Sequence, residues 1–400
     1  MRIALFSETY LPQINGVATH VKTLKEGMEA LGHQVLVVTA DPKAEVCHMK
    51  EGVLRCPAAE LKDLYGYGMA PSYNLERMRL IQAFSPDIAH THTEFGIGST
   101  GLETARKLKI PFIYTLHTMW DDYLHYVASP TLQPVVRKMI HRYLRYFASQ
   151  ADAIIGPSVK SRDFLHHCGV KREIEVIPNA VELEQFSRDR TDPVTVKMLR
   201  QFYNIQNDDT VICFCGRLGQ EKSVDVLIRF FAQCRQKEAH LKLLLIGDGP
   251  ALSELKELTR RLNAGSAVIF TGAVPHESVR EVYACSDLYA TASRSEVNSI
   301  SMLEAMSMGL PVLQRLDEAN PGQVTVGVNG YVFRTAEEFS AILLRFRNSS
   351  HVGQARMQAS TANSVKGLHP TGLARQMEAI YLRLATCRPA SLNAWKEEVK

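Results

Sequence analysis

Residues 288–309 read LYATASRSEVNSISMLEAMSMG and pass from a short apolar run through a polar loop into a stretch with helical spacing. The run Leu288–Thr291 is typical of a buried strand, and the stretch after the loop predicts a helix that ends near Gly309. A strand, a turn and a helix in this order make up one half of a βαβ unit. The segment therefore predicts an α/β fold with a parallel sheet.

The same order of strand, turn and helix recurs along the rest of the chain, and it restarts at Thr210–Cys215. The pattern predicts two doubly wound Rossmann-like domains, residues 1–180 and 181–367, with residues 181–207 as the connection between them. We expect residues 368–400 to form a helix that packs back on the first domain. Two such domains in series are expected to face each other across a ligand cleft at the carboxyl ends of their strands.

The composition limits the classes of function. With 400 residues, 46% of them hydrophobic, the chain can fill two cores of ordinary size, and a net charge of +4 gives no support to nucleic-acid binding. The eight cysteines form no Cys-x-x-Cys pair, no apolar run approaches the roughly 18 to 20 residues of a membrane span, and the first residues are too polar for a signal peptide. We therefore expect a reduced, cytoplasmic protein that is soluble or lies on a membrane surface.

Two glutamates, Glu296 and Glu304, stand eight residues apart around the start of the predicted helix. Glu296 would lie at the start of that helix and Glu304 about 7 to 8 Å further along it. The two carboxylates could therefore bind opposite ends of one elongated ligand. The free N–H groups of Asn298, Ser299 and Ile300 would point at a phosphate between them. An alternative reading is that Glu296 is a capping acid and Glu304 a solvated helix residue.

A glycine turn, Gly216–Ser223, follows the strand that opens the second half of the chain. Such a turn lets Arg217 and Lys222 reach a common anion, for which a diphosphate is the natural candidate. A solvated loop is the alternative. Near the amino terminus, Asn15 and Gly16 join the first strand to the first helix without the spacing of the dinucleotide or P-loop motifs, so hydride transfer and ATP hydrolysis lose support.

Histidines end two strands of the first half of the chain. His90 and His92 follow one strand and His117 follows the next, where open α/β sheets place their ligands. No third ligand is spaced to complete a metal site with His90 and His92, so we expect no metal. The loop around His117 could also be an ordinary exposed loop.

A basic amphipathic helix is predicted over Val136–Phe147, because no acidic residue occurs between Asp122 and Asp152. Helices of this kind lie on anionic membrane surfaces. The alternative is a core helix with a solvated basic rim. Its basic residues are Arg137, Lys138, Arg142 and Arg145, and its apolar residues are Val136, Met139, Ile140, Tyr143, Leu144 and Phe147.

Taken in order, these motifs resemble the retaining glycosyltransferases of GT-B fold, family 4, and in particular the bacterial diacylglycerol glucosyltransferases. The resemblance covers nearly the whole chain. The matching positions are Asn15-Gly16, the His90–Phe95 and Tyr114–Tyr126 segments, Ile177-Pro178-Asn179, Gly216-Arg217 with Glu221-Lys222, Gly247–Pro250, and the Glu-x7-Glu pair.

The resemblance implies a role for each of these residues. Arg217 and Lys222 would hold the diphosphate of a nucleotide-sugar donor, Glu304 the ribose hydroxyls, and Glu296 the hydroxyls of the transferred sugar. The remaining implied donor contacts are the backbone at Gly16, which would approach from the first domain, the turn at Gly247, the amides of Asn298, Ser299 and Ile300, and His117 over the donor sugar.

The resemblance also implies transfer of a hexose, glucose from UDP-glucose, to diacylglycerol at the inner face of the cell membrane. Configuration would be retained and no metal required, since Arg217 and Lys222 can stabilise the leaving diphosphate. A mannosyl or galactosyl transferase with another lipid or soluble acceptor, and an inactive nucleotide-sugar-binding module, remain alternatives. The chain departs from the family where Asn298-Ser299 replaces a usual glycine and where Ser223 follows Lys222.

Overall fold

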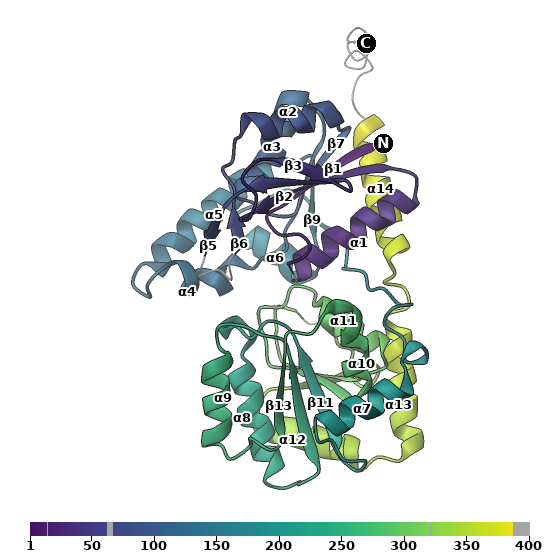
Figure 1. The fold of residues 1–400 in the computed structure, drawn as a ribbon. Coiled ribbons are helices and arrows are strands. Elements are labelled where there is room, and N and C mark those ends of the chain that lie inside the picture. The colour runs from purple at the N-terminus through teal and green to yellow at the C-terminus, as the bar shows by residue number, and fades with distance from the viewer. Residues whose placement is uncertain (14, 62–66, 321, 387–400) are drawn as a thin grey trace. The chain divides into compact units, whose positions relative to one another are not determined.

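The computed structural model describes residues 1–13, 15–61, 67–320 and 322–386. The chain divides into two compact units, and Figure 1 shows each of them as a sheet with helices around it. Unit 1 consists of Met1–Pro178 together with the segment that begins at Pro370, and unit 2 consists of Asn179–His369. Two parallel-sheet α/β units confirm the predicted fold class.

Unit 1 is built on an eight-stranded sheet in the order β10-β9-β8-β7-β1-β2-β4-β3, in which only β3 is antiparallel to its neighbour. A separate antiparallel pair, β5 and β6, follows β4. The strands are β1 Arg2–Ser7, β2 Gln34–Asp41, β3 His48–Lys50, β4 Val53–Pro57, β5 Ala59–Leu61, β6 Tyr67–Met69, β7 Ile88–Thr91, β8 Phe112–Thr115, β9 Ala153–Gly156 and β10 Glu175–Val176.

Helices connect these strands and cover the sheet. The central strands are buried along nearly their whole length, as expected for a parallel sheet with helices on both faces. The helices of unit 1 are α1 Gly16–Ala30, α2 Leu75–Phe84, α3 Gly96–Leu108, α4 Leu124–Val127, α5 Gln133–Ser149, α6 Val159–His167 and α14 Pro370–Thr386.

Helix α14, at the carboxyl end of the described chain, packs against α1 of unit 1 (Figure 1). A Cβ atom added at Gly27 of α1 would lie 2.8 Å from the Cβ atom of Ala374, so the glycine allows the two helices to come close. His33 Nε2 contacts Glu378 Oε1 at 2.8 Å, and the Tyr381 hydroxyl contacts His90 Nδ1 at 2.7 Å. Helix α14 is thereby part of the core of unit 1.

Unit 2 is built on a six-stranded parallel sheet in the order β13-β12-β11-β14-β15-β16. Its strands are β11 Thr210–Cys215, β12 Leu241–Ile246, β13 Val268–Gly272, β14 Leu288–Thr291, β15 Val312–Arg315 and β16 Gly330–Phe333. Its helices are α7 Pro193–Phe202, α8 Val224–Arg235, α9 Leu252–Arg261, α10 Val279–Ala284, α11 Ile300–Ser307, α12 Ala336–Arg347 and α13 His351–Ser364.

The residues expected to connect the domains, 181–207, belong to unit 2. Val181, Phe186 and Ile205 are buried in its core, and helix α7 packs against α10. The chain enters unit 2 at Asn179 and leaves it at His369, and close to these two points the amide of Val181 donates a hydrogen bond of 2.8 Å to the carbonyl of Leu368. The two crossing segments are therefore paired within unit 2.

Across the described residues, we find no helix that combines the length and the apolarity needed to span a bilayer.

A buried carboxyl group, Glu8, lies just beyond the carboxyl end of β1. Its Oε1 atom accepts a hydrogen bond of 2.8 Å from the amide of Ile97, in the first turn of α3. Its Oε2 atom has no hydrogen-bond partner among the described residues. Burial outweighs these contacts and raises the pKa of Glu8 to about 8. A side chain at Gly96 would overlap the Glu8 carboxyl, which explains the glycine at the start of α3.

The raised pKa of Glu8 predicts a stability that depends on pH. The folded chain holds this proton more tightly than the unfolded chain, so its contribution is complete below pH 4.5 and is lost as the pH rises through about 8. The substitution Glu8→Gln keeps an acceptor for the Ile97 amide and removes the ionisation. We expect its melting temperature to exceed that of the wild type at pH 9, with the difference shrinking towards pH 6.

Circular dichroism melts at several pH values between 6 and 9 measure this difference. Glu60→Gln, at an exposed position in β5, is the matched control and should show no such trend. A melting-temperature difference for Glu8→Gln that stays constant from pH 6 to pH 9 would contradict the assignment of a proton to the buried carboxyl.

Candidate functional site

Two glycine turns pack against each other at the carboxyl edge of the unit 2 sheet. Gly216 follows β11 with φ of +154°, and Gly247 follows β12 with φ of +135°. A Cβ atom at Gly247 would overlap the carbonyl oxygen of Gly216. The amide of Leu218 donates to the carbonyl of Asp248 at 2.9 Å, which joins the two turns. Only glycine permits this close approach of the two backbones, and it fixes where the side chain of Arg217 begins.

The two cations of the first turn are each held by a carboxylate. Arg217 Nη2 lies 2.8 Å from Glu221 Oε1, and the Glu221 side chain is fully buried. Lys222 Nζ lies 2.7 Å from Glu296 Oε1. The sequence predicted that Arg217 and Lys222 converge on one anion, whereas in the structure each forms an ion pair with a separate glutamate. Both cations are therefore already positioned at this edge of the sheet.

The structure decides between the two readings of Glu296 and Glu304. Ser299, not Glu296, caps α11, since its hydroxyl accepts a hydrogen bond from the amide of Met302. Glu304 is only 5% exposed, and its carboxylate accepts hydrogen bonds from His276 Nε2 at 2.8 Å and from the Tyr283 hydroxyl at 3.4 Å. Glu296 is therefore not the cap of α11, and Glu304 is not a solvated helix residue. A carboxylate has lone pairs beyond those used by these two partners, so Glu304 is a candidate acceptor for ligand hydroxyl groups.

The segment between the two glutamates differs from its prediction in one respect. The amide of Ser299, expected to be free, donates to Gln323 Oε1 at 3.0 Å. The side chain of Asn298 turns to Asn179, accepting from its amide at 3.0 Å, while the Asn179 side chain donates to the Asn298 carbonyl at 2.7 Å. The prediction of three free amides was therefore wrong for Ser299. The residues that replace the family's glycine form contacts within unit 2.

In unit 1, three imidazoles gather at the carboxyl edge of the sheet. His92 follows β7, His117 follows β8, and His20 comes from α1. His92 Nδ1 and His117 Nε2 are 3.1 Å apart, and the ring centroid of His20 lies 4.6 Å from that of His117 and 5.2 Å from that of His92. Burial holds the pKa values of His92 and His117 well below the usual 6.5, so both rings are neutral at physiological pH.

His92 and His117 form, with His20, a cluster of three imidazoles that the sequence analysis did not predict. One candidate ligand nitrogen from each of His20, His92 and His117 lies within 4.8 Å of the others. Three imidazoles are a chemically suitable ligand set for zinc, which binds histidine nitrogens at Zn–N distances of about 2.0 to 2.1 Å. His90 lies outside this group, with its two ring nitrogens 2.7 Å from the hydroxyls of Tyr381 and Thr115. His20 was detectable as a polar residue on the apolar face of the first predicted helix.

Gly16 begins α1, four residues before His20. Asn15 caps the helix by accepting a hydrogen bond of 2.9 Å from the amide of Ala18. A Cβ atom built at Gly16 would meet no other atom within 4 Å, so the space beside this backbone is open. The structure thus gathers Gly16 and His117 in unit 1, and the remaining predicted donor residues in unit 2: Arg217, Lys222, Gly247, Glu296, Asn298, Ser299, Ile300 and Glu304.

Helix α5 is amphipathic, but its exposed apolar residues differ from those predicted. Leu144 and Phe147, two of the residues predicted for the membrane, are buried in the core. Met139 is 66% exposed. Four exposed apolar residues lie on one face of α5, at spacings of three, four and seven residues that begin at its N-cap residue. We define them as the apolar stripe of α5: Leu132, Val135, Met139 and Tyr146.

Basic side chains flank the apolar stripe of α5. Lys138, Arg142 and Arg145 are exposed beside it. Arg137 points elsewhere, with its Nε atom 3.5 Å from Asp121 Oδ2. An exposed apolar stripe with cations along its edge matches a helix that lies on an anionic surface, whereas the buried residues at its carboxyl end hold the helix on unit 1.

Comparisons with known proteins identify the family of the chain. Residues 14–185 match the model of Glycosyltransferase Family 4, and residues 196–362 match that of Glycosyl transferases group 1. The chain is 35% identical over 314 residues to the alpha-monoglucosyldiacylglycerol synthase of Streptococcus pneumoniae, covering 78% of this chain and 70% of the relative. It is 30% identical over 398 residues to the enzyme of the same name from Acholeplasma laidlawii, covering 98% of this chain and 100% of the relative.

A solved structure shares the fold. The Anabaena protein HepE in complex with UDP-glucose superposes with a TM-score of 0.71 at 20% identity, covering 96% of this chain and 100% of that protein. The family models together span both units, and the near-full-length relatives agree with them. The chain therefore belongs to glycosyltransferase family 4 and is a glycosyltransferase of GT-B fold.

Proposed function

We propose that this glycosyltransferase transfers glucose from UDP-glucose to diacylglycerol at the inner face of the cell membrane, with retention of configuration and without a metal. The observation that carries the proposal is the set of charged groups in unit 2. Arg217 and Lys222 lie at the carboxyl edge of one sheet together with the buried carboxylate of Glu304 and the Lys222-bound carboxylate of Glu296. The relatives of 30 and 35% identity, both named alpha-monoglucosyldiacylglycerol synthase, support the choice of acceptor.

The proposed donor uses the groups of unit 2 by charge and hydrogen-bonding type. The diphosphate is negative and suits Arg217 and Lys222, whereas the ribose hydroxyls are donors and suit the carboxylate of Glu304. Glu296, held by Lys222, would accept hydrogen bonds from the hydroxyls of the sugar. The N-terminus of α11 adds partial positive charge at the same edge.

The proposed chemistry follows from where charge develops. The bond from the anomeric carbon to the phosphate oxygen breaks, the sugar becomes oxocarbenium-like, and negative charge grows on the departing diphosphate. Arg217 and Lys222 stabilise that charge without needing to reorganise. The departing phosphate oxygen takes the proton of the acceptor hydroxyl, and the acceptor oxygen bonds to the anomeric carbon on the same face. His117 would contact the sugar as a neutral imidazole, consistent with its lowered pKa.

The donor assignment predicts a loss of activity for Glu304→Gln. This substitution keeps the size of the side chain but removes the charge that strengthens hydrogen bonds to the ribose. A hydrogen bond to a charged group contributes about 1.5 to 3 kcal/mol, so we expect kcat/KM for UDP-glucose to fall about 10- to 100-fold. Released UDP and labelled glucosyl-diacylglycerol are the two readouts.

Glu277→Gln, at an exposed position on the same side of unit 2, is the control and should retain full activity. GDP-mannose and UDP-galactose are supplied in parallel, because a mannosyl or galactosyl transferase is the competing candidate. Absence of UDP release from the wild type with every lipid acceptor would refute the enzyme assignment proposed here.

The membrane assignment predicts that binding depends on the cations beside the apolar stripe of α5. The triple substitution of Lys138, Arg142 and Arg145 by Gln should weaken binding to phosphatidylglycerol vesicles about 100-fold, since each basic residue near an anionic surface contributes about 1 kcal/mol. Co-sedimentation measures the bound fraction. Replacing the exposed cations Lys43, Arg79 and Lys171 of the same unit by Gln is the matched control. Equal losses in the two triple variants would argue against a role of α5.

Metal independence predicts that chelation leaves the rate unchanged. The purified enzyme is treated with EDTA and assayed with UDP-glucose and diacylglycerol, while elemental analysis measures its zinc content. We expect full activity, because Arg217 and Lys222 supply the positive charge at the diphosphate. A rate that falls on chelation, recovers with zinc and is lost in His92→Ala would instead establish a metal at His20, His92 and His117.

A further inference from the structure

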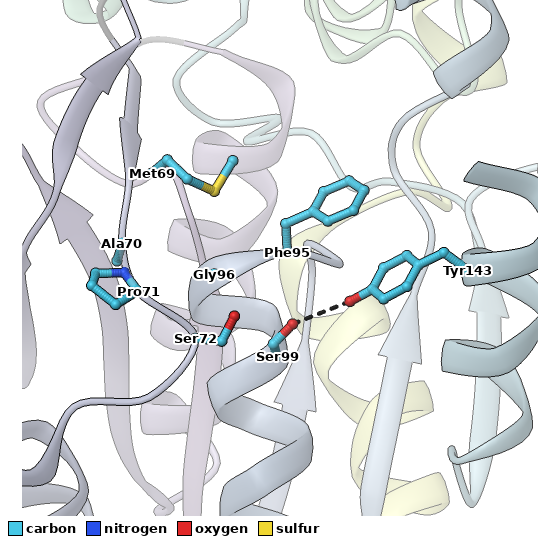
Figure 2. A pocket seen from close by; sticks show the side chains of 8 residues that line it. All are labelled: Met69, Ala70, Pro71, Ser72, Phe95, Gly96, Ser99 and Tyr143. Atoms are coloured by element: carbon cyan, nitrogen blue, oxygen red, sulfur yellow. Dashed lines mark hydrogen bonds between the residues drawn. The ribbon is translucent and has the colours of Figure 1, made fainter. Parts of the chain in front are cut away.

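A pocket of about 450 Å³ opens in unit 1 between the segment after β6, the start of α3, and α5. Figure 2 shows the Ala70–Ser72 segment on one side of the space and the ring of Tyr143 on the other, with Gly96 and Ser99 of α3 between them. A volume of this size lies in the range of small-molecule sites. The walls are mainly apolar and include Met69, Ala70, Pro71 and Phe95.

The walls of the pocket are held in place by aromatic contacts. The rings of Phe95 and Tyr143 stack with centroids 4.9 Å apart and an angle of 10° between their planes. Trp120 meets Phe95 edge-on at 5.0 Å and donates a hydrogen bond of 3.0 Å to Glu94 Oε2. These contacts tie α5 to the start of α3, so the pocket is a built feature of unit 1.

The polar groups of the pocket are hydroxyls. The Tyr143 hydroxyl donates to the Glu94 carbonyl at 2.6 Å and lies 3.1 Å from the Ser99 hydroxyl (Figure 2). Hydroxyl oxygens that donate can still accept a hydrogen bond from a ligand. Every lining residue that the structure describes is uncharged. The pocket therefore suits a neutral, largely apolar ligand with a hydroxyl group, and an anionic ligand would find no countercharge on its walls.

Two neighbours of the pocket relate it to the proposed reaction. Tyr143 follows Met139 by four residues and precedes Tyr146 by three, so the pocket borders the apolar stripe of α5. Phe95 follows His92 by three residues, and three residues of chain span at most about 11 Å. The pocket therefore borders the apolar stripe of α5 through Tyr143, and Phe95 in its wall lies within about 11 Å of His92 along the chain.

We propose that this pocket receives the glycerol end and the first acyl methylenes of a neutral diacylglycerol acceptor, which enters from the side of α5. The assignment rests on the proposed function, because it names the place where the lipid acceptor of that reaction binds. The apolar walls take the methylenes, each of which contributes about fourfold in affinity when buried. The hydroxyls of Ser99 and Tyr143 meet the polar end of the lipid.

Ser72→Trp tests the pocket by filling its rim. Ser72 is exposed, and its only described hydrogen bond uses the backbone carbonyl, which accepts from the Thr100 hydroxyl at 2.9 Å, so the fold should tolerate the change. We expect KM for dioleoylglycerol to rise at least tenfold, while KM for UDP-glucose stays within twofold of the wild type. Gln82→Trp, at an exposed position on α2, is the control for an added surface tryptophan and should leave both constants unchanged.

Photo-crosslinking of the wild type gives a readout that does not depend on how a variant folds. Diacylglycerol with a diazirine near the carbonyl end of one acyl chain is presented in phosphatidylglycerol vesicles, and the labelled peptides are mapped by mass spectrometry. We expect labels within Met69–Ser72, Phe95–Ser99 or at Tyr143, and their loss on competition with unlabelled diacylglycerol.

The outcomes separate the pocket from the reaction. A wild type that forms no glucosyl-diacylglycerol refutes the proposed function. A wild type that forms it, together with a Ser72→Trp variant whose KM for dioleoylglycerol equals that of Gln82→Trp, overturns the pocket assignment alone. Specific labels confined to other parts of the chain would also overturn it.

Discussion

Parallel pairing of the strands is the constraint on which the rest of this structure depends. Strands that run in one direction must be joined by crossovers, so their carboxyl ends, and the loops that follow them, lie along one edge of each sheet. In unit 1 this edge carries the histidines after β7 and β8, and in unit 2 it carries the glycine turns and Glu296. The parallel sheet therefore brings together side chains that are far apart in the sequence.

The sequence predicted the parallel core of each unit but not its margins. The predicted runs Thr210–Cys215 and Leu288–Thr291 correspond to β11 and β14, because fully buried strands are short apolar runs between turns. The short strands β3 and β5 have exposed residues and no apolar run, so they gave no such signal. Residues 181–207 looked like a connection because α7 presents apolar side chains to solvent, Phe202 among them, as well as to the core.

The candidate site was predictable in its residue types and less so in its pairings. The spacing of Glu296 and Glu304 and the position of Lys222 after a strand follow from local sequence alone. Their partners do not, since His276 reaches Glu304 and Gln323 reaches Ser299 across separate elements. Helix α5 shows the same limit in another form. Its helical period was predicted correctly. Which apolar residues are buried, such as Leu144 and Phe147, and which are exposed, such as Met139, depends on the part of the helix that packs on unit 1.

The contact between Asn179 and Asn298 joins the point where the chain enters unit 2 to the loop that carries Glu296. Asn179 is the first residue after the chain passes out of unit 1, and both of its nitrogen donors are held by Asn298, two residues beyond Glu296. Asn179 is thus hydrogen-bonded to the loop that carries Glu296, the residue proposed to bind the sugar. These two hydrogen bonds join the start of unit 2 to the loop, so a ligand that fixes the loop also restrains Asn179. A glycine at position 298 would remove the hydrogen bond to the Asn298 side chain and keep only the one from the Asn179 side chain to the backbone carbonyl.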